Sequence, residues 1–188
     1  MMRFACQSRR LAARLWPLAL VVLCAGLCFG PNTGLGQPAG ETCIHFWRQG
    51  ENSGFARIEG PKPVGTEWKQ YEFSGVAPAD AAVFCLALQF FGEAGNVWYD
   101  DAELSVDGKK LELPNPGFEE GMAHWVSRAA AAGAGKHEID ETVAHSGKRS
   151  GRIDATGGYY YWKPEGQFLA VKPGQKITAR FWAKCSGR

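Results

Sequence analysis

The sequence predicts an all-β sandwich built from short strands. Its 188 residues include 24 glycines and 10 prolines, which favour turns and interrupt helices. Apolar and polar residues alternate with a period of two in several short runs, as in strands that bury one face. Turn-forming sequences separate these runs, at 59–61, 107–108, 115–117, 146–147, 157–158 and 172–174. Short strands at this spacing are typical of β-sandwiches and barrels.

Three of these runs predict strands with different degrees of burial. Residues 82–91 (AVFCLALQFF) are largely apolar on both faces, which predicts a central strand covered on both sides. Residues 67–75 (EWKQYEFSG) alternate as in a half-exposed strand. Residues 176–184 (KITARFWAK) carry small or apolar side chains at every second position from Ile177 to Ala183, which predicts one core-facing side.

The N-terminal segment has the features of a signal peptide. Residues 1–14 carry four arginines and no acidic residue, and the apolar run 15–30 follows. A positive segment before an apolar run that is short for a membrane span predicts export. We expect residues 1–36 to be a signal peptide and 37–41 a linker, and the mature protein to be secreted, periplasmic or at the cell surface. Retention of the segment as an uncleaved anchor is the alternative.

The charge of the mature part argues against two classes of partner. Residues 37–188 carry 17 basic and 19 acidic residues, because residues 1–36 hold four of the 21 lysines and arginines. A net charge near −2 gives no electrostatic reason to expect binding to nucleic acid or anionic lipid. We therefore expect no nucleic-acid partner and, after cleavage of the signal peptide, no membrane partner.

Three cysteines lie in the mature part, namely Cys43, Cys85 and Cys185. None has the C-x-x-C spacing of a zinc site. They permit one disulfide with a thiol left over, or three buried thiols, and we favour buried thiols.

Sequence motifs in both halves of the mature chain point to one family. Residues 111–188 contain NPGFEEG, His124-Trp125, AHSGKRSGRI and QFLAVKPGQKITARFWAK, and residues 42–110 contain CIHFWRQ, GTEWKQYEFSGVAPADAAVFCLAL and GEAGNVWYDDAEL. These motifs resemble the first and second halves, respectively, of carbohydrate-binding modules of families 4, 9 and 22, the CenC-like proteins. The resemblance implies a jelly-roll β-sandwich of the galactose-binding-like kind and a sugar ligand.

The two halves stand in reversed order along the chain, and one strand occurs twice. IHFW (44–47) matches ARFW (179–182). Two accounts fit: a slice of a tandem array of modules, or a circular permutant in which 111–188 supply the first strands and 42–110 the last. Neither half alone has enough strands to close two sheets, so we prefer a single permuted sandwich. Only one copy of the repeated strand then fits the inner position, and we expect the copy with Trp182 at a sheet edge.

The candidate ligand-binding residues combine aromatic rings with polar groups. Sugar rings present apolar C–H faces bordered by hydroxyl groups, so a binding surface needs flat aromatic side chains beside hydrogen-bonding ones. Each copy of the repeated strand has this pattern, and the stretch YYYW (159–162) adds a second aromatic group. Tryptophans packed beneath a loop would be the alternative. The predicted ligand-binding residues are Trp47, His45, Arg57, Trp182, Arg180, Tyr160 and Trp162.

Two pairs of adjacent acidic residues invite a catalytic or a metal-binding interpretation. Neighbours within a strand point to opposite faces, so neither Asp100-Asp101 nor Glu119-Glu120 is a matched acid and base. The resemblance implies that the first and last strands meet, where the family often holds a structural calcium. We expect Glu119, Asp100 and Asp101 to be its ligands, since hard oxygen ligands suit this ion. A plain polar strand end is the alternative.

No nucleophile elbow or metal-binding histidine spacing is present in the sequence. The sequence therefore predicts an exported, non-catalytic carbohydrate-binding module that recognises a poly- or oligosaccharide, alone or joined to further modules. The alternatives are a structural or adhesive β-sandwich without sugar binding, a fragment of a larger modular glycoside hydrolase, and a jelly-roll glycosidase or lyase.

Overall fold

The computed structural model describes residues 42–52, 54–91, 94–129, 135–166 and 168–186. The predicted signal peptide (1–36) and linker (37–41) lie outside these residues. The described residues all belong to one compact unit, Gly34–Arg188. They contain no helix, and their strands form two antiparallel sheets that pack against each other. The predicted all-β sandwich is confirmed at this level.

The first sheet has the strand order β2-β1-β4-β10-β7, with β11 paired to β4. Its strands are β1 (Cys43–Trp47), β2 (Ala56–Glu59), β4 (Val83–Phe91), β7 (Trp125–Ala129), β10 (Tyr159–Pro164) and β11 (Leu169–Ala170). Strand β4 lies between β1 and β10, which confirms the central position predicted for residues 82–91.

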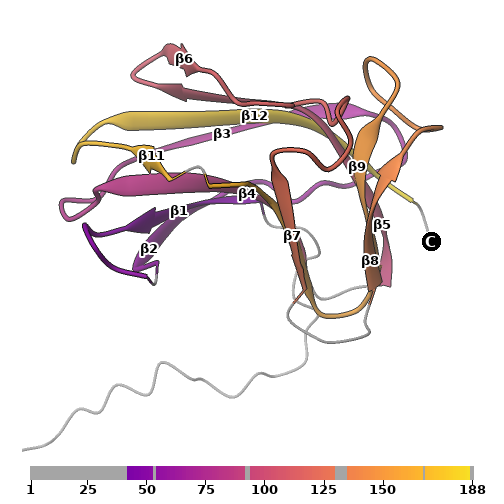
Figure 1. Ribbon diagram of the computed structural model, residues 1–188, viewed down its shortest axis with the longest axis horizontal. Coiled ribbons are helices and arrows are strands. Elements are labelled where there is room, and N and C mark those ends of the chain that lie inside the picture. Colours follow the sequence, from indigo (N-terminus) through magenta and orange to yellow (C-terminus); the bar gives the residue numbers. More distant parts are fainter. Residues whose placement is uncertain (1–41, 53, 92–93, 130–134, 167, 187–188) are drawn as a thin grey trace, which may run out of the picture. The chain divides into compact units, whose positions relative to one another are not determined.

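The second sheet has the order β3-β12-β5-β9-β8, with β6 paired to β5. Its strands are β3 (Lys69–Val76), β5 (Ala94–Val106), β6 (Lys109–Leu111), β8 (Gly135–Asp140), β9 (Ser150–Thr156) and β12 (Lys176–Cys185). Figure 1 shows the two layers, with β3 and β12 in one and β1, β2 and β4 in the other. Strands from residues 42–110 and from 111–188 occur in both sheets.

The strand that carries Trp182 is an inner strand. Strand β12 pairs with β3 on one side and with β5 on the other over most of its length. The expected edge position is therefore wrong, because β12 buries its whole apolar face and is hydrogen-bonded on both sides. The two copies of the repeated strand lie in different sheets, β1 in the first and β12 in the second.

The core lies between the sheets and is built from alternate residues of their strands. In β4 the inward positions are Phe84, Leu86, Leu88 and Phe90, and in β12 they are Ile177, Ala179, Phe181 and Ala183. These positions are at most 4% exposed. The hydroxyl of Tyr99, on β5, donates to the backbone carbonyl of Gln89, on β4, and so joins the two sheets.

The NPGFEEG motif (115–121) forms a turn that inserts an aromatic ring into this core. Asn115 donates its side-chain amide to the carbonyl of Gly121 at 3.0 Å, and the indole of Trp125 donates to the Asn115 carbonyl at 2.7 Å. Phe118 is fully buried and stacks on Trp125 with ring centroids 4.7 Å apart. A Cβ at Gly151 would approach the Phe118 ring to 2.5 Å, so only glycine leaves room for the ring.

Candidate functional site

The outer face of the first sheet carries a group of aromatic and polar side chains around Trp47. We call this surface the Trp47 face; it consists of His45 and Trp47 on β1, Gln89 on β4, and Tyr159, Tyr161 and Lys163 on β10. Their neighbours along each strand point into the core, so these residues point away from it. A hollow of about 310 Å³ opens on this face. It is lined by His45, Trp47, Gly54, Cys85, Ala87, Gln89, Tyr159, Tyr161 and Lys163.

A buried amide links the polar groups of the hollow. Gln89 is 3% exposed. Its Nε2 atom donates to the Tyr159 hydroxyl at 2.8 Å and lies 3.2 Å from Nε2 of His45. Burial, followed by the charge of nearby Arg57, lowers the pKa of His45 below 6.5. The neutral imidazole can therefore accept a hydrogen bond from the Gln89 amide, which orients three polar groups together.

The indole of Trp47 divides this hollow from a second one. The second hollow has a volume of about 290 Å³ and is lined by residues 47–52, Val83 and Phe168. The edge of one ring faces the other in the contact between Trp47 and Phe168, with centroids 4.8 Å apart and planes at 81°. Phe168 is 48% exposed and adds aromatic surface beside Trp47.

The predicted ligand-binding residues are divided between this surface and other parts of the fold. Arg57, on β2, lies opposite His45 in the strand pairing and forms an ion pair with Glu59. His45, Trp47 and Arg57 thus share one face.

Tyr160 and Trp162 point the other way. They are 1% and 0% exposed and pack in the core, so they present no surface to a ligand and their predicted role is corrected. The alternate residues Tyr159 and Tyr161 occupy the outer face, with ring centroids 5.3 Å apart.

The Trp182 side chain lies on the outer face of the second sheet, where another side chain covers it. The imidazole of His145 stacks on the indole with centroids 3.7 Å apart and planes at 13°. Trp68 contacts the same imidazole edge-on at 5.7 Å. Arg180 forms an ion pair with Glu72 at 2.5 Å. Trp182 and Arg180 are therefore engaged with protein groups, and the imidazole of His145 is stacked in parallel on the Trp182 indole.

Acidic side chains hold the loop that brings His145 over Trp182. Asp100 is 0% exposed, and its Oδ2 accepts the backbone N–H groups of His145 at 2.8 Å and Ser146 at 3.2 Å. Burial is the main cause that raises the pKa of Asp100 to about 6, against the lowering effect of these hydrogen bonds. Asp101 contacts the imidazole Nδ1 of His145 at 2.7 Å through Oδ2 and accepts the Ser146 hydroxyl at 2.8 Å through Oδ1.

Glu119 completes this arrangement from the other end of the loop. Its Oε1 accepts the backbone N–H groups of Lys148 at 2.8 Å and Arg149 at 3.0 Å. Gly147, directly before Lys148, has φ of 59°, and a Cβ there would come within 2.2 Å of the same oxygen. Glycine is thus required for both the backbone conformation and the approach of the carboxylate. We refer to residues 145–149 with Asp100, Asp101 and Glu119 as the His145 clasp.

The three acidic residues predicted to bind calcium therefore contact one loop. Within the part of the chain that the structure describes, no group of three or more His, Cys, Asp or Glu side chains is placed to hold a metal ion. Calcium binding stays a prediction, and the structure shows these carboxylates organising the backbone.

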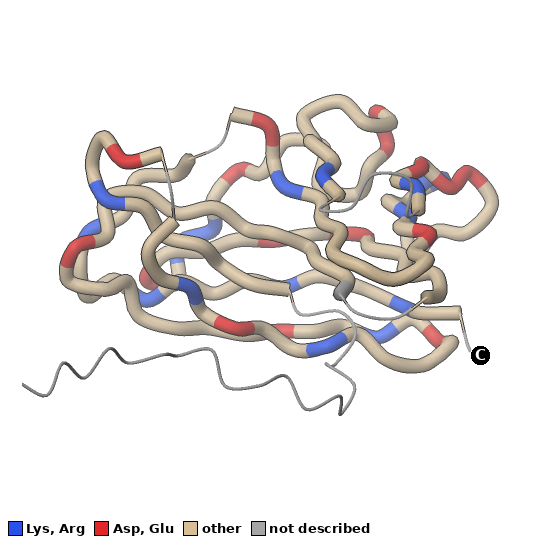
Figure 2. Tube along the Cα trace, turned by 90° about the horizontal axis from the view of Figure 1, so that it is seen from below, with Lys and Arg blue, Asp and Glu red and all other residues tan. Residues whose placement is uncertain are grey.

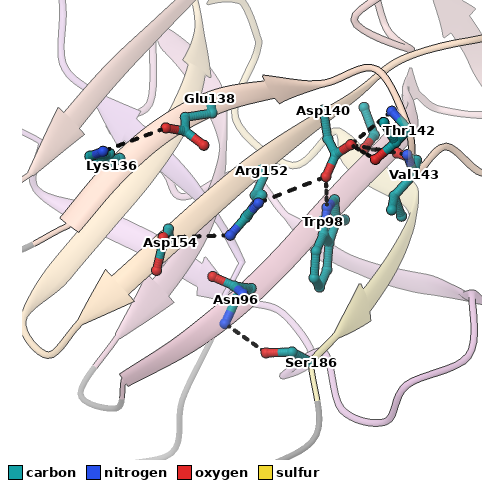
Figure 3. A network of polar contacts seen from close by, with 11 residues as sticks. Asn96, Trp98, Lys136, Glu138, Asp140, Thr142, Val143, Arg152, Asp154 and Ser186 are labelled. Atoms are coloured by element: carbon teal, nitrogen blue, oxygen red, sulfur yellow. Dashed lines mark hydrogen bonds and ion pairs between the residues drawn. The ribbon is translucent and has the colours of Figure 1, made fainter.

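The motif around Trp98 forms a polar network on the outer face of the second sheet (Figure 3). The indole of Trp98 donates to Asp140 at 2.8 Å, and the guanidinium of Arg152 lies 5.5 Å from its ring centroid. Lys184 lies over the same ring at 5.7 Å. Trp98 is 9% exposed, so this indole is covered by its charged neighbours and is unsuited to stack on a ligand.

A larger hollow lies elsewhere, beside β5 and β6. Its volume is about 880 Å³, and the described lining is Asp101, Ala102, Glu103, Lys110, Leu111, Glu112, Leu113, Pro114 and Pro116. None of these residues is aromatic, so the hollow lacks the flat surface on which a sugar ring stacks.

Charges of both signs are interspersed along the described chain (Figure 2). No described helix is long and apolar enough to span a membrane. No family model, curated protein or solved structure matches this chain. The case for a function therefore depends on the residues of the site themselves.

Proposed function

We propose that the protein is an exported, non-catalytic carbohydrate-binding protein whose ligand site is the Trp47 face. One observation supports the proposal above all: aromatic rings and hydrogen-bonding groups line the same hollow on an outer sheet face. Trp47, Tyr159 and Tyr161 supply rings for the apolar faces of sugars, and His45, Gln89 and Lys163 supply donors and acceptors for hydroxyl groups. The proposed ligand is a poly- or oligosaccharide.

The chemistry of the hollow supports binding without cleavage. Most glycoside hydrolases use two carboxyl groups that flank the scissile bond. The described residues that line the hollow include no Asp or Glu. The acidic residues that the sequence predicted to bind calcium belong to the His145 clasp on the second sheet, namely Asp100, Asp101 and Glu119.

Two further features belong to the same proposal. The sandwich would be a jelly roll of the CenC-like kind, circularly permuted; strands from residues 42–110 and from 111–188 occur together in both sheets, which supports this part of the proposal. The protein would be secreted, periplasmic or displayed at the cell surface, on the basis of the predicted signal peptide.

A glycan array probed with the mature protein tests the proposal. We expect binding to at least one family of poly- or oligosaccharides, and loss of the same signals in Trp47→Ala at equal protein concentration. Thin-layer chromatography of each bound oligosaccharide after prolonged incubation should show no products. Absence of binding across the array would favour a structural or adhesive sandwich. Hydrolysis products would favour a piece of a modular glycoside hydrolase.

A further inference from the structure

The Trp47 face carries an excess of positive charge. Lys163 is the one charged side chain among the described residues that line the hollow. Arg57 lies opposite His45 in the strand pairing, and Arg128 lies opposite Tyr161. Directly opposed residues of antiparallel strands share a face, so the three cations surround the hollow. The one acidic side chain paired with any of them is Glu59, next to Arg57, among the ion pairs of the described residues.

Lys163 contacts an aromatic ring and no carboxylate of the described residues. Arg48, Lys110 and Arg180 each have a carboxylate partner within 3.5 Å. Among the described residues Lys163 forms no ion pair, and its ammonium nitrogen lies 5.4 Å from the centroid of the Phe168 ring. Arg128 also forms no ion pair there.

The positive charge around the hollow does not follow from the net charge of residues 37–188. Residues 37–188 carry more acidic than basic residues. A sheet face with unpaired cations is therefore opposite in sign to the net charge of this part of the chain. Lys163 and Cys85 line the same hollow. The pKa of Cys85 is raised to about 11, mainly by burial, and the Lys163 charge is the group that opposes the rise. Lys163 is half-buried, and no carboxylate pairs with it among the described residues, so an anionic ligand group could form a charge-assisted hydrogen bond with its ammonium.

We propose that the ligand of the Trp47 face is an anionic glycan, with a carboxylate or sulfate group that pairs with Lys163. This inference rests on the proposed carbohydrate-binding function and names the ligand class of that site. Arg57 and Arg128 attract the anionic chain from either side, while Trp47 and the two outer tyrosines contact the sugar rings.

The test compares ligands that differ only in charge. Calorimetric titrations use oligosaccharides of galacturonate and of mannuronate, each against the same compound with its carboxylates reduced to hydroxymethyl groups. Sulfated galactan oligosaccharides against their desulfated forms distinguish the sulfate from the carboxylate as the source of charge. We expect at least one acidic ligand to bind about tenfold more tightly than its neutral counterpart, as for a charge-assisted contact.

Variants of Lys163 assign the preference to its charge. Lys163→Gln should weaken binding of the acidic ligand about fivefold to tenfold more than it weakens binding of the neutral one. Lys163→Arg should keep the preference. Lys109→Gln removes one charge from an exposed position on β6, in the other sheet, and should change neither affinity.

Each outcome decides between this inference and the function on which it rests. Equal affinities for acidic and neutral ligands, or equal losses for both in Lys163→Gln, would overturn the anionic-ligand inference and leave carbohydrate binding intact. Binding of polyanions that persists in Trp47→Ala would overturn it as well, because general electrostatic attraction needs no aromatic platform. Absence of binding to every oligosaccharide, acidic or neutral, would overturn the proposed function itself.

Discussion

The outer faces of the two sheets carry the same short sequence pattern in opposite surroundings. In IHFW (44–47) and ARFW (179–182) the phenylalanine enters the core and the tryptophan points outward. The indole of Trp182 is stacked beneath His145. The indole of Trp47 lines two hollows, and its plane makes an angle of 81° with the ring of Phe168.

The difference comes from segments that lie far away in the sequence. The loop 145–149 reaches Trp182 because Asp100, Asp101 and Glu119 hold its backbone and its imidazole. On the first sheet the segment that approaches Trp47 contributes Phe168, whose ring meets the indole edge-on. A strand motif thus fixes which side chain points outward, while a distant loop decides whether that side chain can contact a ligand.

The largest expected effect comes from separating the two halves of the chain. Residues 42–110 and 111–188 both contribute strands to each sheet, so neither part alone can pair β4 with β10 or β12 with β5. Expressed separately, neither half should show a cooperative thermal transition by circular dichroism. Mixing the halves tests whether they complement each other. A sharp transition in either isolated half would show that the two outer faces do not depend on one shared core.

Asp100→Asn tests whether the His145 clasp contributes to stability and not to ligand affinity at the Trp47 face. The buried carboxylate accepts backbone N–H groups through both oxygens, and an amide replaces one acceptor by a donor. We expect a loss of about 2–3 kcal/mol in the free energy of unfolding, measured in urea.

Asp154→Asn is the matched control for this loss. Its side chain is 43% exposed, and the substitution should change stability by less than about 0.5 kcal/mol. Ligand affinity at the Trp47 face should not change in either variant. A parallel loss of affinity in Asp100→Asn would show that the two faces are coupled.

The two tryptophans should respond oppositely to truncation. Trp47→Ala removes the proposed aromatic platform and should weaken glycan binding about tenfold or more, with a small change in stability. Trp182→Ala removes the stack on His145 and should lower the free energy of unfolding by about 1–2 kcal/mol while affinity is kept. Calorimetric titration and urea unfolding of both variants measure the two quantities. Equal losses of affinity would contradict the assignment of the site to the first sheet.

Local alternation predicted the parts of the fold that depend on one strand at a time. It identified the central position of β4, the core-facing positions of β12 and the outward direction of Trp47 and Trp182. It failed at Tyr160 and Trp162, because all four residues of YYYW are aromatic and a period of two does not say which face is the core. Pairing with β4 and β7 decides this, and such long-range pairing leaves no local pattern.

The edge position predicted for Trp182 failed for a related reason. The strand with Trp182 was expected at a sheet edge because a strand near a chain end can fray. In the structure β12 is hydrogen-bonded to β3 on one side and to β5 on the other. The stack of His145 on Trp182 also joins residues 37 positions apart in the sequence. Gln89 was overlooked because a single amide in an apolar run looks like part of the core, and its partners His45 and Tyr159 come from two other strands.

If the predicted ligands bind calcium, the ion should stabilise the protein through the His145 clasp on the second sheet and not through the Trp47 face. Calcium at about ten times its dissociation constant should raise the free energy of unfolding by about 1.4 kcal/mol in protein freed of metal by a chelator. Glu119→Gln should lose this response, and Trp47→Ala should keep it. A melting curve that neither calcium nor chelator shifts would leave the three carboxylates with the role that the structure shows, the organisation of loop 145–149.

The smallest expected effect is a pH dependence that belongs to the Trp47 face. Burial and the charge of Arg57 lower the pKa of His45 from 6.5. The unfolded chain therefore binds a proton at this imidazole at a higher pH than the folded protein does. Stability contributed by the neutral imidazole is fully present above pH 6.5 and is lost as the pH falls below that value.

Thermal unfolding of the wild type and of His45→Gln between pH 7.5 and pH 5 isolates this contribution, because groups common to both proteins, such as His137, cancel in the difference. We expect the melting temperature of the wild type to fall more steeply with acidification than that of His45→Gln. His124→Gln, at an exposed position with a side chain 53% accessible, is the matched histidine control and should follow the wild type. A wild type and a His45→Gln variant with parallel pH profiles would show that the imidazole is not held neutral in the hollow, and the hydrogen bond from the Gln89 amide would then lose its acceptor.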